Sequence, residues 1–188
     1  MQQRAFIVHG WGGFPGEGWF PWLKRELEHR GFVVQVPAMP APHTPKLSDW
    51  LQTLRETVGR VDEKTIFIGH SLGCYAILKF LENPPSEQVA GGAVLVAGFR
   101  ALNIPVLNVF YAPPLDWTVI KAHAGKIIAI HSDHDPYVPL AKGEEFRQQL
   151  GAQLHVLTGY RHFSGSEGVT ELPAALDAVL AISASPPA

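Results

Sequence analysis

A serine flanked by glycines is the feature of this sequence best suited to covalent chemistry. Residues 69–73 read Gly-His-Ser-Leu-Gly, and they lie between a short apolar run and a segment with helical periodicity. In this setting the serine sits on a sharp turn, and a glycine two residues away on each side avoids clashes of Cβ atoms. We therefore predict that Ser71 is a nucleophile. The alternative is a plain glycine-rich turn before a helix.

A serine nucleophile needs a base, and the base needs a group that orients it. Proteins that use this turn carry the three groups in the order serine, acid, histidine. Residues 131–139 read H-S-D-H-D-P-Y-V-P and residues 158–163 read T-G-Y-R-H-F, each after an apolar run. We predict His162 as the base and Asp135 as the acid, because Asp-Pro starts the turn into the next helix. Asp133 is the rival acid, and we expect it to cap that turn instead.

Two backbone N–H groups are candidates for an oxyanion hole, which stabilises the charge that develops when serine attacks a carbonyl. One is the N–H of Leu72, at the start of the helix after the serine. The other is expected from residues 9–13, which read H-G-W-G-G and follow the first apolar run. We predict the N–H of Trp11 as this donor. The alternative is that these glycines form only a flexible turn.

The segment from Phe99 to Trp117 is rich in apolar residues and contains three prolines. It lies where larger proteins with this serine turn insert a cap domain, but it is too short to form one. We predict that it forms an apolar wall beside Ser71, with Phe110 and Trp117 as substrate-binding residues. The alternative is a loop that only packs on the sheet.

Other reactive side chains near these motifs have structural interpretations. Cys74 follows the serine turn, and we expect it to be buried rather than reactive. His9 and His70 are expected to pack against or orient loops. A dense cluster of potential metal ligands follows the fifth apolar run, but we predict no metal site, because one of its carboxylates already orients the base: His131, Asp133, His134 and Asp135.

Strand-like and helix-like segments alternate between these motifs. Apolar runs typical of strands buried on both faces lie at 5–8, 33–36, 65–68, 93–96, 127–130 and 154–157. Helical periodicity is found from Trp19 to Leu27, and Gly31 closes this helix. A second helix is expected after a cap at Ser48 or Asp49, and further helices at 74–81, 140–150 and 170–182. This alternation predicts an α/β fold, a three-layer α/β/α sandwich with a doubly wound, mostly parallel, six-stranded sheet. The motifs follow strands, where such sheets bind ligands.

Length and composition are those of a folded domain. The chain has 188 residues, 46% hydrophobic and 17% charged, and we expect one domain over residues 1–182 with a frayed tail over 183–188. A net charge of −2 without a dense basic run argues against a nucleic-acid partner. The first apolar run is too short for a secretory signal, no segment approaches the ~20 apolar residues of a membrane span, and one cysteine excludes an internal disulfide. We expect a cytoplasmic protein without membrane association.

Together, the motifs at 9–12, 69–73, 135–139 and 162–163 resemble the small serine hydrolases grouped with retinoblastoma-binding protein nine and its bacterial relatives. The likeness covers nearly the whole chain, including the Met39-Pro40 loop and the missing cap. It implies a minimal α/β-hydrolase fold without a cap domain, and it assigns the nucleophile, acid and base to Ser71, Asp135 and His162. Family members often have glycine before the histidine, where this chain has Arg161. The Leu-x-Cys-x-Glu motif is absent, so binding to a retinoblastoma-type pocket protein is not expected.

The predicted function is hydrolysis of a carboxylic ester or related acyl compound, or of a small amide or peptide, through an acyl-enzyme. The expected partner is a small acyl substrate, and the chemistry requires no cofactor or metal. Two alternatives remain open at this point. One is a non-catalytic interaction module on the same scaffold, and the other is an acyltransferase, which differs from a hydrolase only in the acceptor.

Overall fold

Six short segments form the strands of one parallel sheet in the computed structural model, which describes residues 2–85 and 89–184. The strands are β1 (Arg4–Val8), β2 (Val33–Gln35), β3 (Thr65–His70), β4 (Gly92–Val96), β5 (Lys126–Ser132) and β6 (Gln153–Leu157). Their order across the sheet is β2-β1-β3-β4-β5-β6, and every neighbouring pair is parallel. Each predicted strand overlaps one of these, and the predicted doubly wound α/β fold is confirmed.

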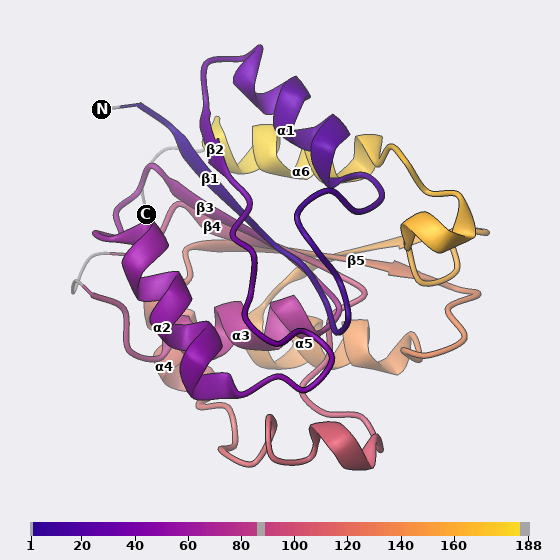
Figure 1. The fold of residues 1–188 in the computed structure, drawn as a ribbon. Coiled ribbons are helices and arrows are strands. Elements are labelled where there is room, and N and C mark those ends of the chain that lie inside the picture. The colour runs from indigo at the N-terminus through magenta and orange to yellow at the C-terminus, as the bar shows by residue number, and fades with distance from the viewer. Residues whose placement is uncertain (1, 86–88, 185–188) are drawn as a thin grey trace.

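Two layers of helices cover the sheet (Figure 1). Helices α1 (Phe20–Glu28) and α6 (Pro173–Ser183) pack on one face, and their apolar side chains share one buried cluster. Helices α2 (Leu47–Val58), α3 (Leu72–Leu81), α4 (Trp117–His123) and α5 (Ala141–Leu150) contribute to the cluster on the other face. Two 3-10 turns, η1 (Pro105–Leu107) and η2 (Gly165–Glu167), lie in the connections.

The register of the sheet brings the ends of the central strands level. Val8 of β1 pairs with Gly69 of β3, and His70 pairs with Val96 of β4. Burial is complete along β3 and β4, as predicted, but the two edge strands are only partly buried. The expectation of burial on both faces is wrong for β2 and β6, because an edge strand has a neighbour on one side only.

One local prediction about a helix cap is wrong, and one helix has no counterpart in the predicted elements. Helix α2 begins at Leu47 after Lys46, without a side-chain cap, so Ser48 and Asp49 lie inside its first turn. Asp49 still places a negative charge near the positive end of the helix dipole. Helix α4 was not predicted; its cap is Asp116, whose carboxylate accepts hydrogen bonds from the backbone N–H groups of Thr118 and Val119.

Within residues 2–85 and 89–184, no helix is long and apolar enough to cross a membrane. Helix α6 includes Ser183, one residue beyond the predicted domain end. Residues 185–188 of the predicted frayed tail lie outside the described residues, so the division at 182 stays a prediction.

Candidate active site

The turn that carries Ser71 joins β3 to α3 with a strained backbone. Ser71 has φ 54° and ψ −119°, a region that residues with a side chain rarely occupy. Its N–H donates to the carbonyl of Val96 at 2.9 Å, which holds the turn against β4. A Cβ at Gly73 would lie 2.3 Å from the carbonyl oxygen of Val8, and one at Gly69 would lie 2.8 Å from Cα of Cys74. Both glycines are therefore required by close backbone approach.

Ser71, His162 and Asp135 form a continuous chain of hydrogen bonds. His162 Nε2 lies 3.0 Å from Ser71 Oγ, and His162 Nδ1 lies 2.8 Å from Asp135 Oδ2. Since a carboxylate can only accept, Nδ1 carries the proton and Nε2 accepts from the serine hydroxyl. The ring of Tyr137 stands edge-on to that of His162, with 5.2 Å between centroids.

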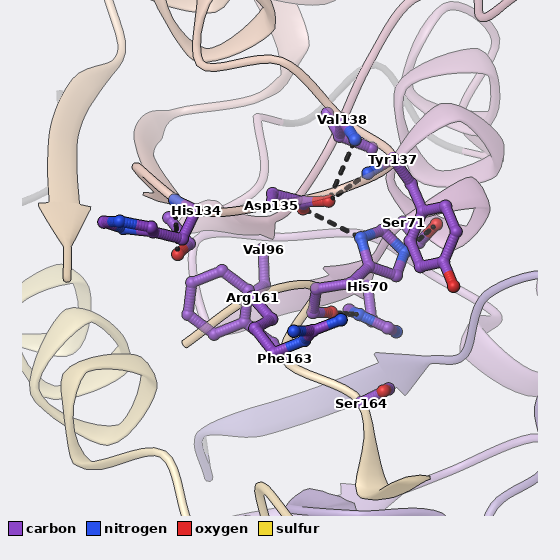
Figure 2. Close-up of polar contacts among 12 residues, drawn as sticks. His70, Ser71, Val96, His134, Asp135, Tyr137, Val138, Arg161, Phe163 and Ser164 are labelled. Atoms are coloured by element: carbon purple, nitrogen blue, oxygen red, sulfur yellow. Dashed lines mark hydrogen bonds and ion pairs between the residues drawn. The ribbon is translucent and has the colours of Figure 1, made fainter. Parts of the chain in front are cut away.

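Asp135 also anchors the loop from which it projects. Its Oδ1 accepts hydrogen bonds from the N–H groups of Tyr137 at 2.8 Å and Val138 at 2.9 Å, drawn as dashed lines in Figure 2. Burial favours a higher pKa for this carboxyl, but the hydrogen bonds from His162 and the two backbone groups outweigh burial and lower the pKa. Asp135 is therefore held as the anion that the imidazole needs.

Asp133, the rival acid, does not reach His162. Its carboxylate accepts from Thr158 Oγ1 at 2.9 Å and pairs with His134 Nδ1 at 2.5 Å. The expectation that Asp133 caps the turn is wrong, because Ser132 Oγ accepts from the His134 N–H and Asp135 caps the residues that follow.

The two histidines among the potential metal ligands at residues 131–135 have different surroundings. His131 is fully buried against Phe146, and burial lowers its pKa to about 4. His134 pairs with Asp133. No group of three or more histidine, cysteine or acidic side chains in the described ranges is arranged to hold a metal ion.

Ser71 and His162 line a cavity of about 480 Å³ together with both apolar and polar side chains. The apolar ones include Phe99, Leu102, Ile104 and Leu107, which belong to the segment predicted as a wall. The polar ones come from the loops around residues 17 and 161–167, and they are Glu17, Arg161, Ser164, Ser166 and Glu167.

The two substrate-binding residues predicted from that segment are not among those lining the cavity. Phe110 is 1% exposed and packs edge-on against Trp50, with ring centroids 5.2 Å apart. Trp117 starts helix α4 and packs against Phe146. The assignment of Phe110 and Trp117 is therefore corrected: Phe110 lies in the core, the partly buried Trp117 packs against it, and the aliphatic side chains of Leu102, Ile104 and Leu107 line the cavity instead.

The residues of the predicted oxyanion donors, Leu72 and Trp11, line the same cavity as Ser71. Leu72 is the first residue of α3, so its N–H has no partner four residues earlier within the helix. Trp11 lines the same cavity, and its indole N–H donates to the carbonyl of His43 at 2.9 Å, which anchors the loop. A Cβ at Gly10 would lie 3.0 Å from Cβ of Ser71, so this loop touches the serine turn.

Three side chains near Ser71 have buried positions. His9 accepts a hydrogen bond from the N–H of Met39 at 3.0 Å and so ties the Trp11 loop to the next one. His70 contacts the backbone of His162, and burial lowers its pKa to about 3. Cys74 is fully buried, and burial raises the pKa of its thiol. These positions agree with packing and orienting roles.

Two glutamates at the cavity were not predicted. Glu167 accepts a hydrogen bond from the His162 N–H at 2.8 Å and pairs with Arg161 at 3.0 Å. The sequence did carry a signal for it, since Ser164 and Glu167 have the S-x-x-E spacing of a capping box, which the structure forms. Glu17 had no such signal, because it reaches the cavity through the contact between Gly18 and Gly165.

The model of the family described as "Serine hydrolase" matches residues 5–181. The chain belongs to the serine hydrolase family. As a serine hydrolase it is an enzyme, which removes the alternative of a non-catalytic interaction module.

Relatives of this serine hydrolase match it over most of their length. The YdeN protein of Bacillus subtilis is 36% identical over 180 residues, which are 94% of either chain. Serine hydrolase RBBP9 of Rattus norvegicus is 34% identical over 171 residues, 87% of this chain and 89% of that one. The crystal structure of the ydeN gene product superposes with a TM-score of 0.91 over 97% of this chain and all of that one, at 34% identity. The expected resemblance and the minimal α/β-hydrolase fold are confirmed.

Proposed function

We propose that this serine hydrolase cleaves carboxylic esters or related acyl compounds, including small amides, through an acyl-enzyme on Ser71. The observation that carries the proposal is the hydrogen-bonded chain Asp135–His162–Ser71, with distances of 2.8 Å and 3.0 Å. A serine hydroxyl is a weak nucleophile on its own, and a base at hydrogen-bonding distance removes that limitation.

In the first half of the reaction, Ser71 Oγ attacks the carbonyl carbon while His162 Nε2 takes the hydroxyl proton. The tetrahedral oxyanion is bound by the N–H groups of Leu72 and Trp11, each of which contributes about 3 kcal/mol to lowering the barrier. Asp135 stabilises the imidazolium and keeps its ring in place. His162 then gives the proton to the leaving group, the carbonyl–leaving group bond breaks, and the acyl-enzyme remains.

The second half repeats these steps with water as the nucleophile. His162 takes a proton from water, the hydroxide adds to the acyl carbonyl, and the same donors bind the oxyanion. When the tetrahedral intermediate collapses, the bond between the acyl carbon and Ser71 Oγ breaks, and Oγ recovers its proton from His162. The products are the acid and a regenerated enzyme.

The lining of the cavity favours a substrate with an apolar acyl group. Phe99, Leu102, Ile104 and Leu107 provide an apolar surface in the cavity that Ser71 lines. An acyl chain that covers this surface gains free energy in proportion to the apolar area that it removes from water. A cavity of about 480 Å³ suits a small-molecule substrate.

We also propose a cytoplasmic location, supported by the single cysteine, which excludes a disulfide within the chain.

The deciding experiment is reaction with a fluorophosphonate probe, which labels only an activated serine. Wild type is compared with Ser71→Ala and His162→Ala, and with Ser48→Ala as a matched serine control, because Ser48 is exposed on α2 and lies outside the cavity lining. Labelling of wild type and the control, with loss in the other two, supports the proposal. Equal labelling of Ser71→Ala would assign the nucleophile elsewhere. Labelled enzyme is then assayed on p-nitrophenyl esters of increasing chain length.

A further inference from the structure

The backbone around His162 is strained on both sides. Arg161 has φ 48° and Phe163 has φ 57°, although neither residue is a glycine. Backbone in this region is unfavourable for residues with a Cβ, and it persists only where surrounding contacts hold it. The conformation of the loop therefore depends on interactions from outside it.

The two peptide groups of His162 are held by side chains from different elements. The His162 N–H donates to Glu167 Oε2 at 2.8 Å, and its carbonyl oxygen accepts from His70 Nε2 at 2.8 Å. Because a carbonyl can only accept, the His70 ring carries its proton on Nε2.

His70 is suited to hold this position permanently. It is the last residue of β3, directly before Ser71, and its ring makes edge contacts with Trp19 and Phe20 at centroid distances of 6.2 Å and 6.0 Å. Burial, together with the nearby His162, lowers the pKa of His70 to about 3. The ring is neutral at physiological pH, and its Nε2–H donates to the His162 carbonyl without placing a second positive charge beside the His162 imidazole.

Glu167, which binds the N–H group of His162, is also held by several hydrogen bonds. Its Oε1 accepts from Arg161 Nε at 3.0 Å, while Oε2 accepts from the N–H groups of His162 and, at 3.4 Å, Ser164. Its side chain is 12% exposed. The same carboxylate thus spans the strained Arg161 peptide and the start of η2, and it fixes the path of the chain through His162.

We propose that His70 and Glu167 are positioning residues that clamp the backbone of His162 and so hold its imidazole between Asp135 and Ser71. The inference rests on the proposed role of His162 as the base. The imidazole is fixed at its ring by Asp135 and Ser71, but these contacts leave the peptide free to relax out of its strained conformation. A shift of about 1 Å in a reacting group can cost about 100-fold in rate, so a backbone clamp affects kcat directly.

The test uses pairs of variants that keep or remove each hydrogen bond. His70→Gln retains an N–H donor, and His70→Leu removes it. Glu167→Gln retains an acceptor, and Glu167→Leu removes it. His155→Leu on β6 and Glu171→Leu on the surface are matched controls. The measurements are the rate of fluorophosphonate labelling, kcat and KM on p-nitrophenyl acetate, and Tm.

We expect each leucine variant at the clamp to lose about 10- to 100-fold in labelling rate and kcat, with KM within about threefold. The glutamine variants should recover most of that loss, and the controls should match wild type. If the leucine variants had a lower Tm but an unchanged kcat per folded molecule, His70 and Glu167 would contribute only to stability, and the inference would be overturned. An equal loss in the glutamine and leucine variants would also overturn it. A wild type that is not labelled at all would instead refute the proposed function.

Discussion

Asp135 and His162 meet through Oδ2 and Nδ1 at 2.8 Å, while Asp133, two residues earlier, faces Thr158 and His134. Asp135→Asn should therefore lower kcat about 10³- to 10⁴-fold, because an amide cannot stabilise the imidazolium and favours the wrong tautomer. Asp133→Asn is the matched control and should keep kcat within about twofold. Steady-state kinetics on a p-nitrophenyl ester distinguish the two. The opposite ranking would assign the acid to Asp133.

The contact between the Trp11 loop and the serine turn predicts a steric effect at Gly10. A Cβ there would lie 3.0 Å from Ser71 Cβ and 3.3 Å from the carbonyl oxygen of His70. Gly10→Ala should push the loop from the nucleophile and lower kcat by about tenfold or more. Gly16→Ala is the control, since its Cβ would meet only the exposed ring of Phe14. A fully active Gly10→Ala enzyme would place the second oxyanion donor outside this loop.

The apolar segment should divide into residues that affect specificity and residues that affect stability. Leu102→Ala removes part of the cavity wall, so it should lower kcat/KM for long acyl esters more than for acetate while Tm changes little. Phe110→Ala removes a buried ring that packs on Trp50 and Tyr75, and should cost about 3–5 kcal/mol of stability with the chain-length preference retained. Kinetics across ester lengths and thermal unfolding measure both effects. A changed chain-length preference in Phe110→Ala alone would reverse the assignment.

Cys74 should be unreactive in the native enzyme. Its side chain is fully buried in the first turn of α3, and burial raises the pKa of the thiol. Ellman's reagent should detect no thiol in native protein and one thiol per chain in guanidinium chloride. Rapid modification under native conditions would show that α3 opens readily, and a concurrent loss of fluorophosphonate labelling would link that opening to Ser71.

Glu17 should make stability depend on pH. Burial raises the pKa of this carboxyl, although the Phe14 backbone and His162 partly oppose the shift. The folded state therefore binds the proton more tightly than the unfolded state, so stability falls as pH rises from the ordinary glutamate range through the raised pKa. Glu17→Gln should be more stable than wild type at pH 7 and equal to it near pH 3. Chemical denaturation at both values checks this, and equal stability at pH 7 would contradict it.

Several features of this enzyme were determined by local sequence. The strands and most helices followed from hydrophobic periodicity, which reports the face that a segment buries. The serine turn was readable because Gly69 and Gly73 meet a steric requirement within a few residues. The chain order of Ser71, Asp135 and His162, each after a strand, was readable because parallel strands end at one edge of the sheet.

Other features were decided by tertiary structure, because they depend on contacts between segments that lie far apart in the chain. Whether Phe110 or Leu102 faces the cavity depends on the core space beside Trp50, which periodicity does not report. Glu17 reaches the cavity because Gly18 and Gly165 touch, and His70 holds the carbonyl of a residue 92 positions away. The sequence thus determined which groups reach the sheet edge, and packing across the edge decided their contacts.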